Sequence, residues 1–321
     1  MDTPDFSASA NPIMLLSGTA SSALGEGIAE VLGEDLCDVT IKRFADGEIF
    51  VGINENVRGR DVFLIQSTNP PAENILELLI MIDAARRASA ARVTVVVPYY
   101  GYGRSDRKDQ PRVSIAAKLM ANLMTAAGAD RVLSIDFHQH QIQGFFDIPV
   151  DHLYAAPVFR RYYEMKKLDN LAVVATDVSV AKMARGYAKR LGGDLAIIDK
   201  RRPSPNVAEV ANIVGNVEGK DCIVPDDMID TAGTMAITVD VLRDQGARDI
   251  YILATHPLFS GPAVERLVKA DVKEITVTDT VPLAPGVLEA LPNLTVLSVA
   301  SLLAQAIEST HTNSSVSMLF N

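Results

Sequence analysis

The sequence lacks tryptophan, and it has few other aromatic residues and only two cysteines. Aromatic side chains make up 6% of the 321 residues, whereas apolar side chains make up 48%. The interior must therefore be built mainly from aliphatic side chains, which suits Val- and Ile-rich parallel strands covered by helices. Cys37 and Cys222 lie far apart and in no metal-like spacing, so we expect free thiols in a reducing cytoplasm.

Long apolar runs and basic clusters are also missing. The longest apolar stretch, Ile75 to Ala85, is interrupted by Glu77 and Asp83 and is far shorter than the ~20 residues of a membrane span. A net charge of −10 without a basic cluster disfavours binding to nucleic acid. Residues 1–12 lack the basic and apolar regions of a signal peptide, so we expect a frayed tail there. These absences predict a cytoplasmic protein with neither a membrane nor a nucleic-acid partner.

Short β-branched runs alternate with amphipathic stretches along the chain. The expected strands are Asp61–Gln66, Arg92–Pro98, Arg131–Phe137, Leu171–Ala175, Leu195–Asp199, Asp221–Val224, Asp249–Thr255 and Glu274–Thr278. The expected helices are Asn74–Ala88, Ser114–Ala127, Ser179–Leu191, Thr234–Gln245 and Ala263–Lys269. Strand and helix in repeated alternation predict an α/β fold with mainly parallel sheets flanked by helices.

Two stretches of the chain, residues 91–101 and 247–257, resemble each other. Each begins with Ala-Arg, follows an expected helix and leads into a loop that contains glycine. The length of the chain also fits two domains. We expect a tail over residues 1–12, a first domain over 13–155 and a similar second domain over 156–321, with the last residues free to pack back on the first domain.

The most informative local pattern runs from Cys222 to Thr234. An apolar strand leads into two adjacent acids, and small and hydroxylated residues then open a helix; the residues concerned are Asp226, Asp227, Asp230, Thr231, Ala232, Gly233 and Thr234. Free amides at a helix start bind phosphate, while carboxylates suit sugar hydroxyls or magnesium. The pattern predicts a ribose-phosphate site. The alternative is a surface turn that uses these residues as a helix cap.

Further stretches carry a resemblance to one enzyme family. They are Arg43–Glu48 (RFADGE), Asn54–Gly59 (NENVRG), Tyr99–Lys108 (YYGYGRSDRK), Ile135–Asp151 (IDFHQHQIQGFFDIPVD), Ile198–Pro203 (IDKRRP) and Ser315–Phe320 (SVSMLF). The 222–234 pattern is similar to a motif shared by type I phosphoribosyltransferases and PRPP synthetases, and these other stretches separate the two. From about Met14 to Phe320 the chain resembles the PRPP synthetases, also called ribose-phosphate pyrophosphokinases.

This resemblance implies a fold, an activity and a cofactor. The implied fold has two similar domains of the type I phosphoribosyltransferase-like kind. The implied reaction transfers the pyrophosphoryl group of ATP to the C1 hydroxyl of ribose 5-phosphate and yields PRPP and AMP. The implied cofactor is Mg²⁺. The resemblance also implies a homo-oligomer, commonly a hexamer, on which ADP or phosphate acts at subunit interfaces.

The resemblance also assigns site residues. It places ATP at Phe44, Asp46, Gly47, Glu48, Arg104, Ser105, Asp106 and His138. It places ribose 5-phosphate at Arg202, Asp226, Asp227, Asp230, Thr231, Ala232, Gly233 and Thr234. The implied metal ligands are His138 and Asp177, with Asp136 as a further candidate. Lys200 and Arg202, on a loop expected to close over the substrates, are the implied catalytic cations.

Some of these residues have plainer interpretations when they are taken alone. Phe44 in a polar loop suits stacking on adenine, but packing in the core is the alternative. His138 follows the strand 131–137 and would alone be interpreted as a structural histidine. No closed set of nitrogen and sulfur ligands indicates zinc, so magnesium is favoured. Lys200 and Arg202 would alone be interpreted as a solvated basic turn.

The chain departs from the family pattern beside Asp177, where two glycines are replaced by Ser179 and Val180. A β-branched residue does not easily take positive φ, so either the backbone differs there or contact with phosphate is reduced. Ser105 replaces a glutamine, and Pro225 removes an amide just before the acids. The main alternative is therefore a catalytically weak regulatory subunit of the same family. A nucleobase phosphoribosyltransferase would lack the adenine site, and a PRPP-sensing transcription regulator would need a basic DNA-binding module.

Overall fold

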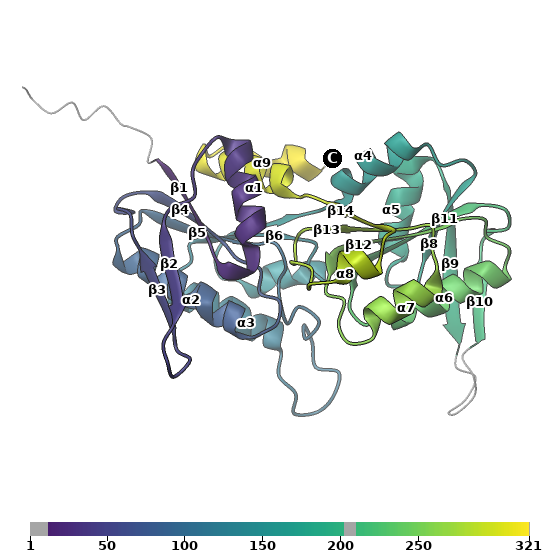
Figure 1. Ribbon diagram of the computed structural model, residues 1–321, viewed down its shortest axis with the longest axis horizontal. Helices are drawn as coiled ribbons and strands as arrows, with labels where there is room; N and C mark the ends of the chain where they lie inside the picture. The colour runs from purple at the N-terminus through teal and green to yellow at the C-terminus, as the bar shows by residue number, and fades with distance from the viewer. Residues whose placement is uncertain (1–11, 202–209, 321) are drawn as a thin grey trace, which may run out of the picture. The chain divides into compact units, whose positions relative to one another are not determined.

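The computed structural model describes residues 12–201 and 210–320. The described chain forms two compact units. The first unit contains the residues up to Tyr154 together with those from Ala300 onward, and the second unit contains Ala155–Val299. Each unit is built around its own sheet (Figure 1).

The first unit has a five-stranded parallel sheet in the order β1-β4-β5-β6-β7. Its strands are β1 (Ile13–Ser17), β4 (Asp61–Ile65), β5 (Arg92–Val97), β6 (Arg131–Ile135) and β7 (Val150–Leu153). All five residues of β4 are buried, as expected for a strand covered on both faces.

Helices cover both faces of this sheet (Figure 1). The helical segments are η1 (Thr19–Ser21), α1 (Ser22–Leu32), α2 (Glu73–Arg87), α3 (Ala116–Ala127), η2 (His140–Phe145), α9 (Ala300–His311) and η3 (Val316–Phe320). Helices α2 and α3 contribute Leu78, Met81 and Met124 to one core cluster. Helix α9 packs against α1. The C-terminal segment thus completes the first unit.

A two-stranded antiparallel hairpin accompanies the first sheet. It consists of β2 (Val39–Arg43) and β3 (Ile49–Ile53), and Arg43 pairs with Ile49. The intervening residues 44–48 form the tip of the hairpin. The sequence pattern did not predict these strands, because most of their residues are only partly buried or exposed.

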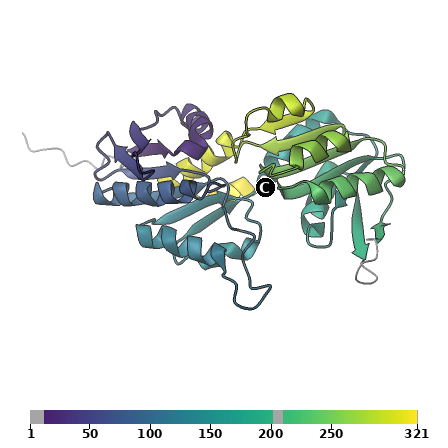
Figure 2. The same cartoon turned by 60° about the horizontal axis from the view of Figure 1, so that its bottom comes forward.

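The second unit has a seven-stranded sheet in the order β10-β9-β8-β11-β12-β13-β14, and only the β9–β10 pair is antiparallel. Its strands are β8 (Leu171–Ala175), β9 (Asp194–Arg201), β10 (Val210–Val214), β11 (Asp221–Ile229), β12 (Ile250–Pro257), β13 (Glu274–Thr278) and β14 (Leu294–Leu297). The helices are α4 (Ala156–Lys166), α5 (Ala181–Leu191), α6 (Gly233–Asp244), α7 (Ala263–Ala270) and α8 (Val287–Ala290). Helices α6 and α7 lie side by side on one face of the sheet (Figures 1 and 2).

The predicted fold class is confirmed: both sheets are mainly parallel and are flanked by helices. Cys37 and Cys222 are free and buried, and burial raises the pKa of each thiol to about 12. Within the described residues, no helix combines the length and the apolar character that a membrane span requires.

Candidate functional site

The tip of the β2–β3 hairpin presents an aromatic ring to solvent. Phe44 is 49% exposed, so the alternative that it packs in the core is wrong. Its ring meets the ring of Phe50 edge to face, with centroids 5.8 Å apart. The ammonium of Lys42 lies 4.9 Å from the centroid of the Phe50 ring. Sequence reasoning missed Phe50, which lies on the same hairpin and holds the Phe44 ring on one edge.

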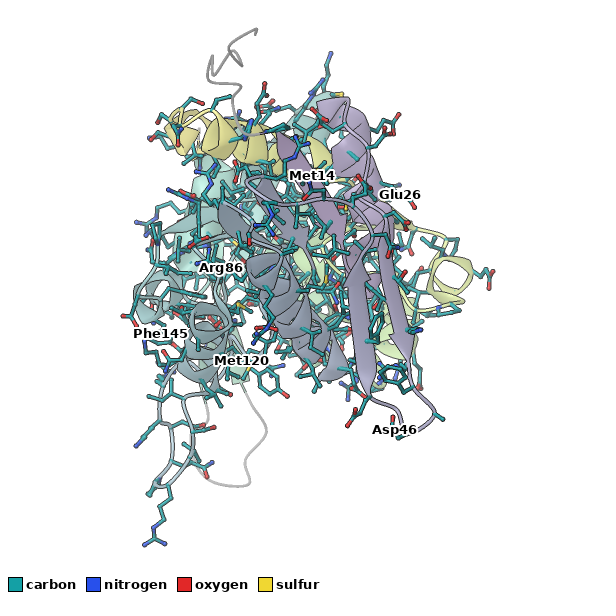
Figure 3. All side chains as sticks on the ribbon, turned by 90° about the vertical axis from the view of Figure 1, so that its left-hand side faces the viewer. Met14, Glu26, Asp46, Arg86, Met120 and Phe145 are labelled. Carbon is teal, nitrogen blue, oxygen red and sulfur yellow. The ribbon has the colours of Figure 1, made fainter. Side chains whose placement is uncertain are left out.

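The remaining residues of this tip form a tight turn. Gly47 has a φ of 94° and donates its amide to the carbonyl of Phe44, at 3.0 Å. The amide of Glu48 donates to the carboxylate of Asp46, at 3.1 Å. Asp46 lies at the end of the hairpin, away from the sheet (Figure 3). The turn therefore presents Phe44, Asp46 and Glu48 together on an exposed ridge.

The loop after β5 is pinned to the loop after β4. The amide of Gly101 donates to the hydroxyl of Thr68, at 2.7 Å. A Cβ atom on Gly101 would lie 2.0 Å from the carbonyl oxygen of Thr68, so only glycine fits. Downstream, Arg104 is exposed, and the carboxylate of Asp106 accepts a hydrogen bond from Gln141, at 3.2 Å. Ser105 accepts from the amide of Ala117, at 3.1 Å, through its carbonyl.

The end of β6 carries Asp136 and His138. Asp136 adopts a φ of 41°, and its amide donates to the carbonyl of Leu153, at 3.0 Å. Burial raises the pKa of Tyr154, and the negative charge of Asp136 adds to that shift. His138 is half-buried, and its Cβ lies 3.7 Å from where a Cβ on Gly103 would be. The strand end thus brings His138 beside the loop that carries Arg104.

A second histidine, His152, supports this strand end and was missed by sequence reasoning. Its Nε2 accepts a hydrogen bond from the amide of Phe137, at 3.0 Å. Its ring contacts those of His140 and Tyr154 in a tilted arrangement, with centroids 5.3 and 4.7 Å away. An acceptor at Nε2 requires the neutral ring. His152 therefore holds the segment from which His138 projects.

In the second unit, Asp177 follows β8 and is bound by its own loop. Its Oδ1 accepts from the amide and the hydroxyl of Ser179, at 2.7 and 2.5 Å, and from the amide of Val180, at 3.3 Å. Val180 has a φ of −84°, so the backbone here does not require glycine. The serine at 179 gives Asp177 a hydroxyl donor, and Val180 contributes only its backbone amide.

The acid pair lies on a strand that continues past a proline. β11 pairs with β8 only through Ile223, whereas its pairing with β12 continues to Ile229. Pro225 is tolerated because the ladder to β8 has already ended there. Sequence reasoning ended this strand at Val224 and was wrong. The extension carries Asp226 and Asp227 beyond β8 at the carboxyl edge of the sheet.

Negative charge accumulates at this edge. The pKa of Asp226 is raised well above its usual value of 3.8, first by burial and then by the charge of Asp227, with Asp177 adding to the shift. Two carboxylates close together disfavour each other's ionised forms unless a cation or hydroxyl donors are bound. The site therefore suits a hydroxyl-rich or cation-bearing ligand.

The turn from β11 into α6 supplies amides beside these acids. Ala232 caps the helix in a left-handed conformation, with φ 56° and ψ 14°. The first hydrogen bond into the helix runs from the amide of Ala236 to the carbonyl of Ala232, at 3.0 Å. The amides of Gly233 and Thr234 therefore precede the helical ladder and face outward at its positive end. The predicted residues Asp226–Thr234 form one contiguous edge.

The implied catalytic cations are described only in part. Lys200 belongs to β9, where its backbone pairs with Ala211. The side chain of Lys200 and all of Arg202 lie outside the described residues.

Residues 12–201 and 210–320 contain no group of three His, Cys, Asp or Glu side chains arranged to hold a metal. One or two carboxylates still suit Mg²⁺, because substrate phosphates usually complete its oxygen ligands.

This edge, with acids beside an amide-rich turn, is typical of α/β proteins that bind phosphorylated sugars. Residues 13–128 match a family model for the N-terminal domain of ribose phosphate pyrophosphokinase, and residues 200–321 match one for the phosphoribosyl synthetase-associated domain. The chain belongs to the ribose-phosphate pyrophosphokinase family.

Individual relatives match over nearly the whole chain. The ribose-phosphate pyrophosphokinase of Chlorobaculum tepidum is 50% identical over 311 residues, which are 97% of this chain and 95% of the relative. The chloroplastic ribose-phosphate pyrophosphokinase 1 of Arabidopsis thaliana is 53% identical over 96% of this chain and 77% of its own length. The crystal structure of phosphoribosylpyrophosphate synthetase from Mycobacterium smegmatis superposes with a TM-score of 0.88 at 43% identity, covering 94% of this chain and 99% of its own.

Proposed function

We propose that this protein is an active ribose-phosphate pyrophosphokinase, which makes PRPP and AMP from ATP and ribose 5-phosphate. The observation that carries the proposal is the carboxyl edge of the second unit, where the acids Asp226 and Asp227 adjoin the amides that open α6. Carboxylates suit the vicinal hydroxyls of a ribose, and the amides suit its phosphate. The identity of about 50% to pyrophosphokinases over nearly the full chain supports the same assignment.

The first unit is assigned the nucleotide. The exposed ring of Phe44 suits stacking on a purine, and Asp46 and Glu48 on the same turn suit its amino group. Arg104 is exposed after β5 and offers a planar cation for a triphosphate. Gly47, Ser105, Asp106 and His138 complete the proposed nucleotide residues.

The reaction is a displacement at phosphorus. The C1 hydroxyl oxygen of ribose 5-phosphate attacks the β-phosphorus of ATP, so that an oxygen–phosphorus bond forms, the bond from the β-phosphorus to the α-bridging oxygen breaks, and AMP leaves. The hydroxyl proton is lost to solvent or to a carboxylate. Such transfers depend mainly on alignment and charge neutralisation. We assign Lys200 and Arg202 to the transferred group, where one cation typically contributes ~3 kcal/mol to transition-state stabilisation.

Magnesium fits the proposal because two of the three candidate ligands, Asp136 and Asp177, are carboxylates and so offer hard oxygen donors. When bound, Mg²⁺ supplies charge neutralisation to the phosphate oxygens. We keep His138, Asp177 and Asp136 as its proposed ligands. Asp177 is held in place by Ser179, so its carboxylate keeps a fixed orientation.

Assembly, regulation and location remain proposals that rest on the sequence. We propose a homo-oligomer, commonly a hexamer in the family, with ADP or phosphate acting at subunit interfaces, and a cytoplasmic location. The weak regulatory subunit is the second candidate, and its main argument was the altered loop beside Asp177. That argument loses force because Val180 adopts an ordinary backbone conformation.

The test is product analysis with purified protein, ATP, ribose 5-phosphate and Mg²⁺. We expect equal amounts of AMP and PRPP, formed only when ribose 5-phosphate is present. ADP as the nucleotide product would mean transfer of a single phosphoryl group, and it would contradict the proposal. Absence of AMP with a correctly folded protein would favour the regulatory subunit.

A further inference from the structure

The turn that opens α6 is held from one side by the segment after β12. We call residues 229–234 the phosphate loop. Three consecutive carbonyls of this loop accept hydrogen bonds from that segment: Ile229 from the amide of Phe259 at 3.0 Å, Asp230 from the amide of Ser260 at 2.8 Å, and Thr231 from the guanidinium Nη1 of Arg266 at 2.9 Å. The first two donors are backbone groups, and the third is the side chain of an exposed residue on α7.

These bonds fix the direction of the loop amides. In a trans peptide the N–H points opposite to the C=O of the same plane. Because the carbonyls of Asp230 and Thr231 face the segment after β12, the amides of Thr231 and Ala232 face away from it. The outward direction of these amides is therefore a consequence of contacts made on the opposite side of the loop.

The bond from Arg266 acts at the most strained point of the loop. It holds the peptide immediately before Ala232, which has a positive φ of 56°. A left-handed conformation is unfavourable for an alanine because its Cβ crowds the following carbonyl oxygen, so this conformation needs support from its surroundings. The guanidinium lies close over the turn, because a Cβ on Gly233 would be 3.3 Å from its Nη1.

We propose that Arg266 is a positioning residue for the sugar-phosphate site, which holds the Thr231–Ala232 peptide so that its amide faces the phosphate of ribose 5-phosphate. This inference rests on the proposed function and adds to it a residue outside the sequence motif. Arg266 acts through the loop rather than on the reacting atoms. Its loss should therefore weaken binding of the sugar phosphate and leave the nucleotide site unchanged.

The test compares Arg266→Gln and Arg266→Lys with the wild-type protein in steady-state kinetics. We expect Arg266→Gln to raise KM for ribose 5-phosphate about tenfold, the usual scale for one lost charged hydrogen bond. KM for ATP should stay within about twofold. Arg266→Lys keeps a charged donor and should recover part of the loss. It also provides the readout if Arg266→Gln does not fold.

A second variant tests the strained residue itself. Glycine takes positive φ without the penalty of a Cβ, so Ala232→Gly should make the loop depend less on Arg266. We expect the double variant Ala232→Gly/Arg266→Gln to have a lower KM for ribose 5-phosphate than Arg266→Gln alone. An unchanged or higher KM in the double variant would overturn the role assigned to this peptide.

Arg243→Gln is the matched control. Its guanidinium also donates to a backbone carbonyl, that of Asp271 at 2.6 Å, and it joins α6 to the far end of α7. We expect no change in either KM. A wild-type KM for ribose 5-phosphate in folded Arg266→Gln, or an equal rise in both KM values, would overturn this inference alone. A wild-type protein that makes no PRPP would instead overturn the proposed function.

Discussion

Each unit holds an equivalent Asp–Arg ion pair at the amino end of its sheet, but only in the first unit does the pair also bind the C-terminal helix. In the first unit, Asp61 begins β4 and binds the guanidinium of Arg92 with both carboxylate oxygens. In the second unit, Asp221 begins β11 and binds Arg248 in the same way, at 2.8 and 2.7 Å. The two arginines occupy the same position in the pair of similar stretches noted in the sequence. A repeated sequence thus corresponds to a repeated contact.

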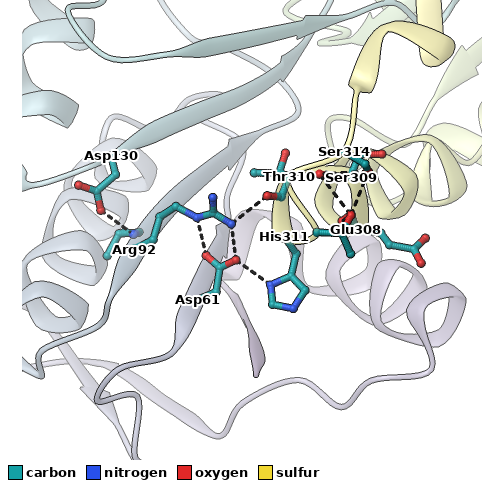
Figure 4. A network of polar contacts seen from close by, with 10 residues as sticks. Asp61, Arg92, Asp130, Glu308, Ser309, Thr310, His311 and Ser314 are labelled. Atoms are coloured by element: carbon teal, nitrogen blue, oxygen red, sulfur yellow. Dashed lines mark hydrogen bonds and ion pairs between the residues drawn. The ribbon is translucent and has the colours of Figure 1, made fainter. Parts of the chain in front are cut away.

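The first unit adds the C-terminal helix to this pair (Figure 4). Arg92 also donates to the carbonyl of Thr310, at 2.9 Å, and His311 Nδ1 lies 2.8 Å from the Asp61 carboxylate. In the second unit, Arg248 donates instead to the nearby carbonyl of Asp169, at 3.1 Å, and its side chain is 51% exposed. The first pair therefore anchors α9, 218 residues further along the chain, whereas the second binds the turn before β8, 79 residues earlier in the chain.

The carboxyl end of the second sheet shows the opposite arrangement. There Asp226 is surrounded by the charges of Asp227 and Asp177, and its pKa is raised. At the amino ends each buried acid faces a cation, whereas at the carboxyl end the acids face one another. Paired acids therefore stabilise the fold within each unit, while accumulated acids mark the edge where α/β proteins bind ligands.

The largest expected effect comes from Asp226→Asn. We expect kcat/KM for PRPP formation to fall about 10²–10³-fold, because a group held against the substrate is lost. We also expect the melting temperature to rise, because asparagine removes a buried charge that its neighbours oppose. The pKa of Asp226 in the folded protein lies above the value of 3.8 expected in the unfolded chain. The folded state therefore favours the protonated carboxyl, and this stabilisation is lost as the pH rises through the folded pKa.

The stability gain of Asp226→Asn should therefore grow as the pH rises above 3.8 and level off once the pH exceeds the folded pKa of Asp226. Thermal melts of both proteins across this range measure it. Asp240→Asn, at an exposed position on α6, is the control and should change neither activity nor melting temperature. If Asp226→Asn melted at a lower temperature than the wild-type protein at every pH, the contrast between paired acids at the amino ends and crowded acids at the carboxyl end would be contradicted.

The next effect is on stability alone. Arg92→Met leaves Asp61 buried without its bidentate partner, and loss of one member of a buried ion pair costs about 3 kcal/mol. We expect the melting temperature to fall by roughly 6–12 °C, with KM values unchanged. Arg248→Met should cost less, because Arg248 is half-exposed. Equal falls in melting temperature for Arg92→Met and Arg248→Met would show that the contacts of α9 add nothing to the stability that the first ion pair provides.

A smaller effect is expected at the hairpin of the first unit. Phe44→Ala should raise KM for ATP about tenfold, since stacking of a base on an aromatic ring is worth ~1–3 kcal/mol. KM for ribose 5-phosphate should not change. Val31→Ala, another exposed apolar position in the first unit, serves as the control. A rise in KM for the sugar phosphate only would contradict the assignment of the nucleotide to this hairpin.

The smallest effect is expected at the loop beside Asp177. Ser179→Ala removes the hydroxyl that donates to the Asp177 carboxylate. We expect roughly a fivefold loss in kcat/KM, on the scale of about 1 kcal/mol for one hydrogen bond. Ser179→Thr keeps the hydroxyl and should retain most activity. An unchanged Ser179→Ala variant would mean that the orientation of Asp177 does not depend on Ser179.

The buried parallel strands were predictable because their β-branched runs are continuous. β4, β5, β8 and β13 lie within one or two residues of the predicted ranges. The β2–β3 hairpin was missed because its strands are half-exposed. The end of β11 was misjudged because a proline normally ends a strand, and the sequence does not reveal that the ladder to β8 has already ended at Ile223.

The candidate site was predictable where one segment carries it. The acids and the phosphate loop are contiguous, so their composition alone indicates a sugar-phosphate site. Arg266, His152 and Phe50 were missed because each acts on another residue through the folded structure. Arg266 reaches a carbonyl 35 residues earlier in the chain, and no local pattern marks such a contact. Assignment of the last helix to the first unit likewise depends on tertiary contacts.

The central claim is that the crowded acids of the second unit belong to the sugar-phosphate site. It is tested most directly by thermal melts of wild-type protein and Asp226→Asn with Mg²⁺ and a non-hydrolysable ATP analogue, with and without ribose 5-phosphate. We expect ribose 5-phosphate to raise the melting temperature of the wild-type protein and to have little effect on the variant. An equal rise in both proteins would contradict the claim.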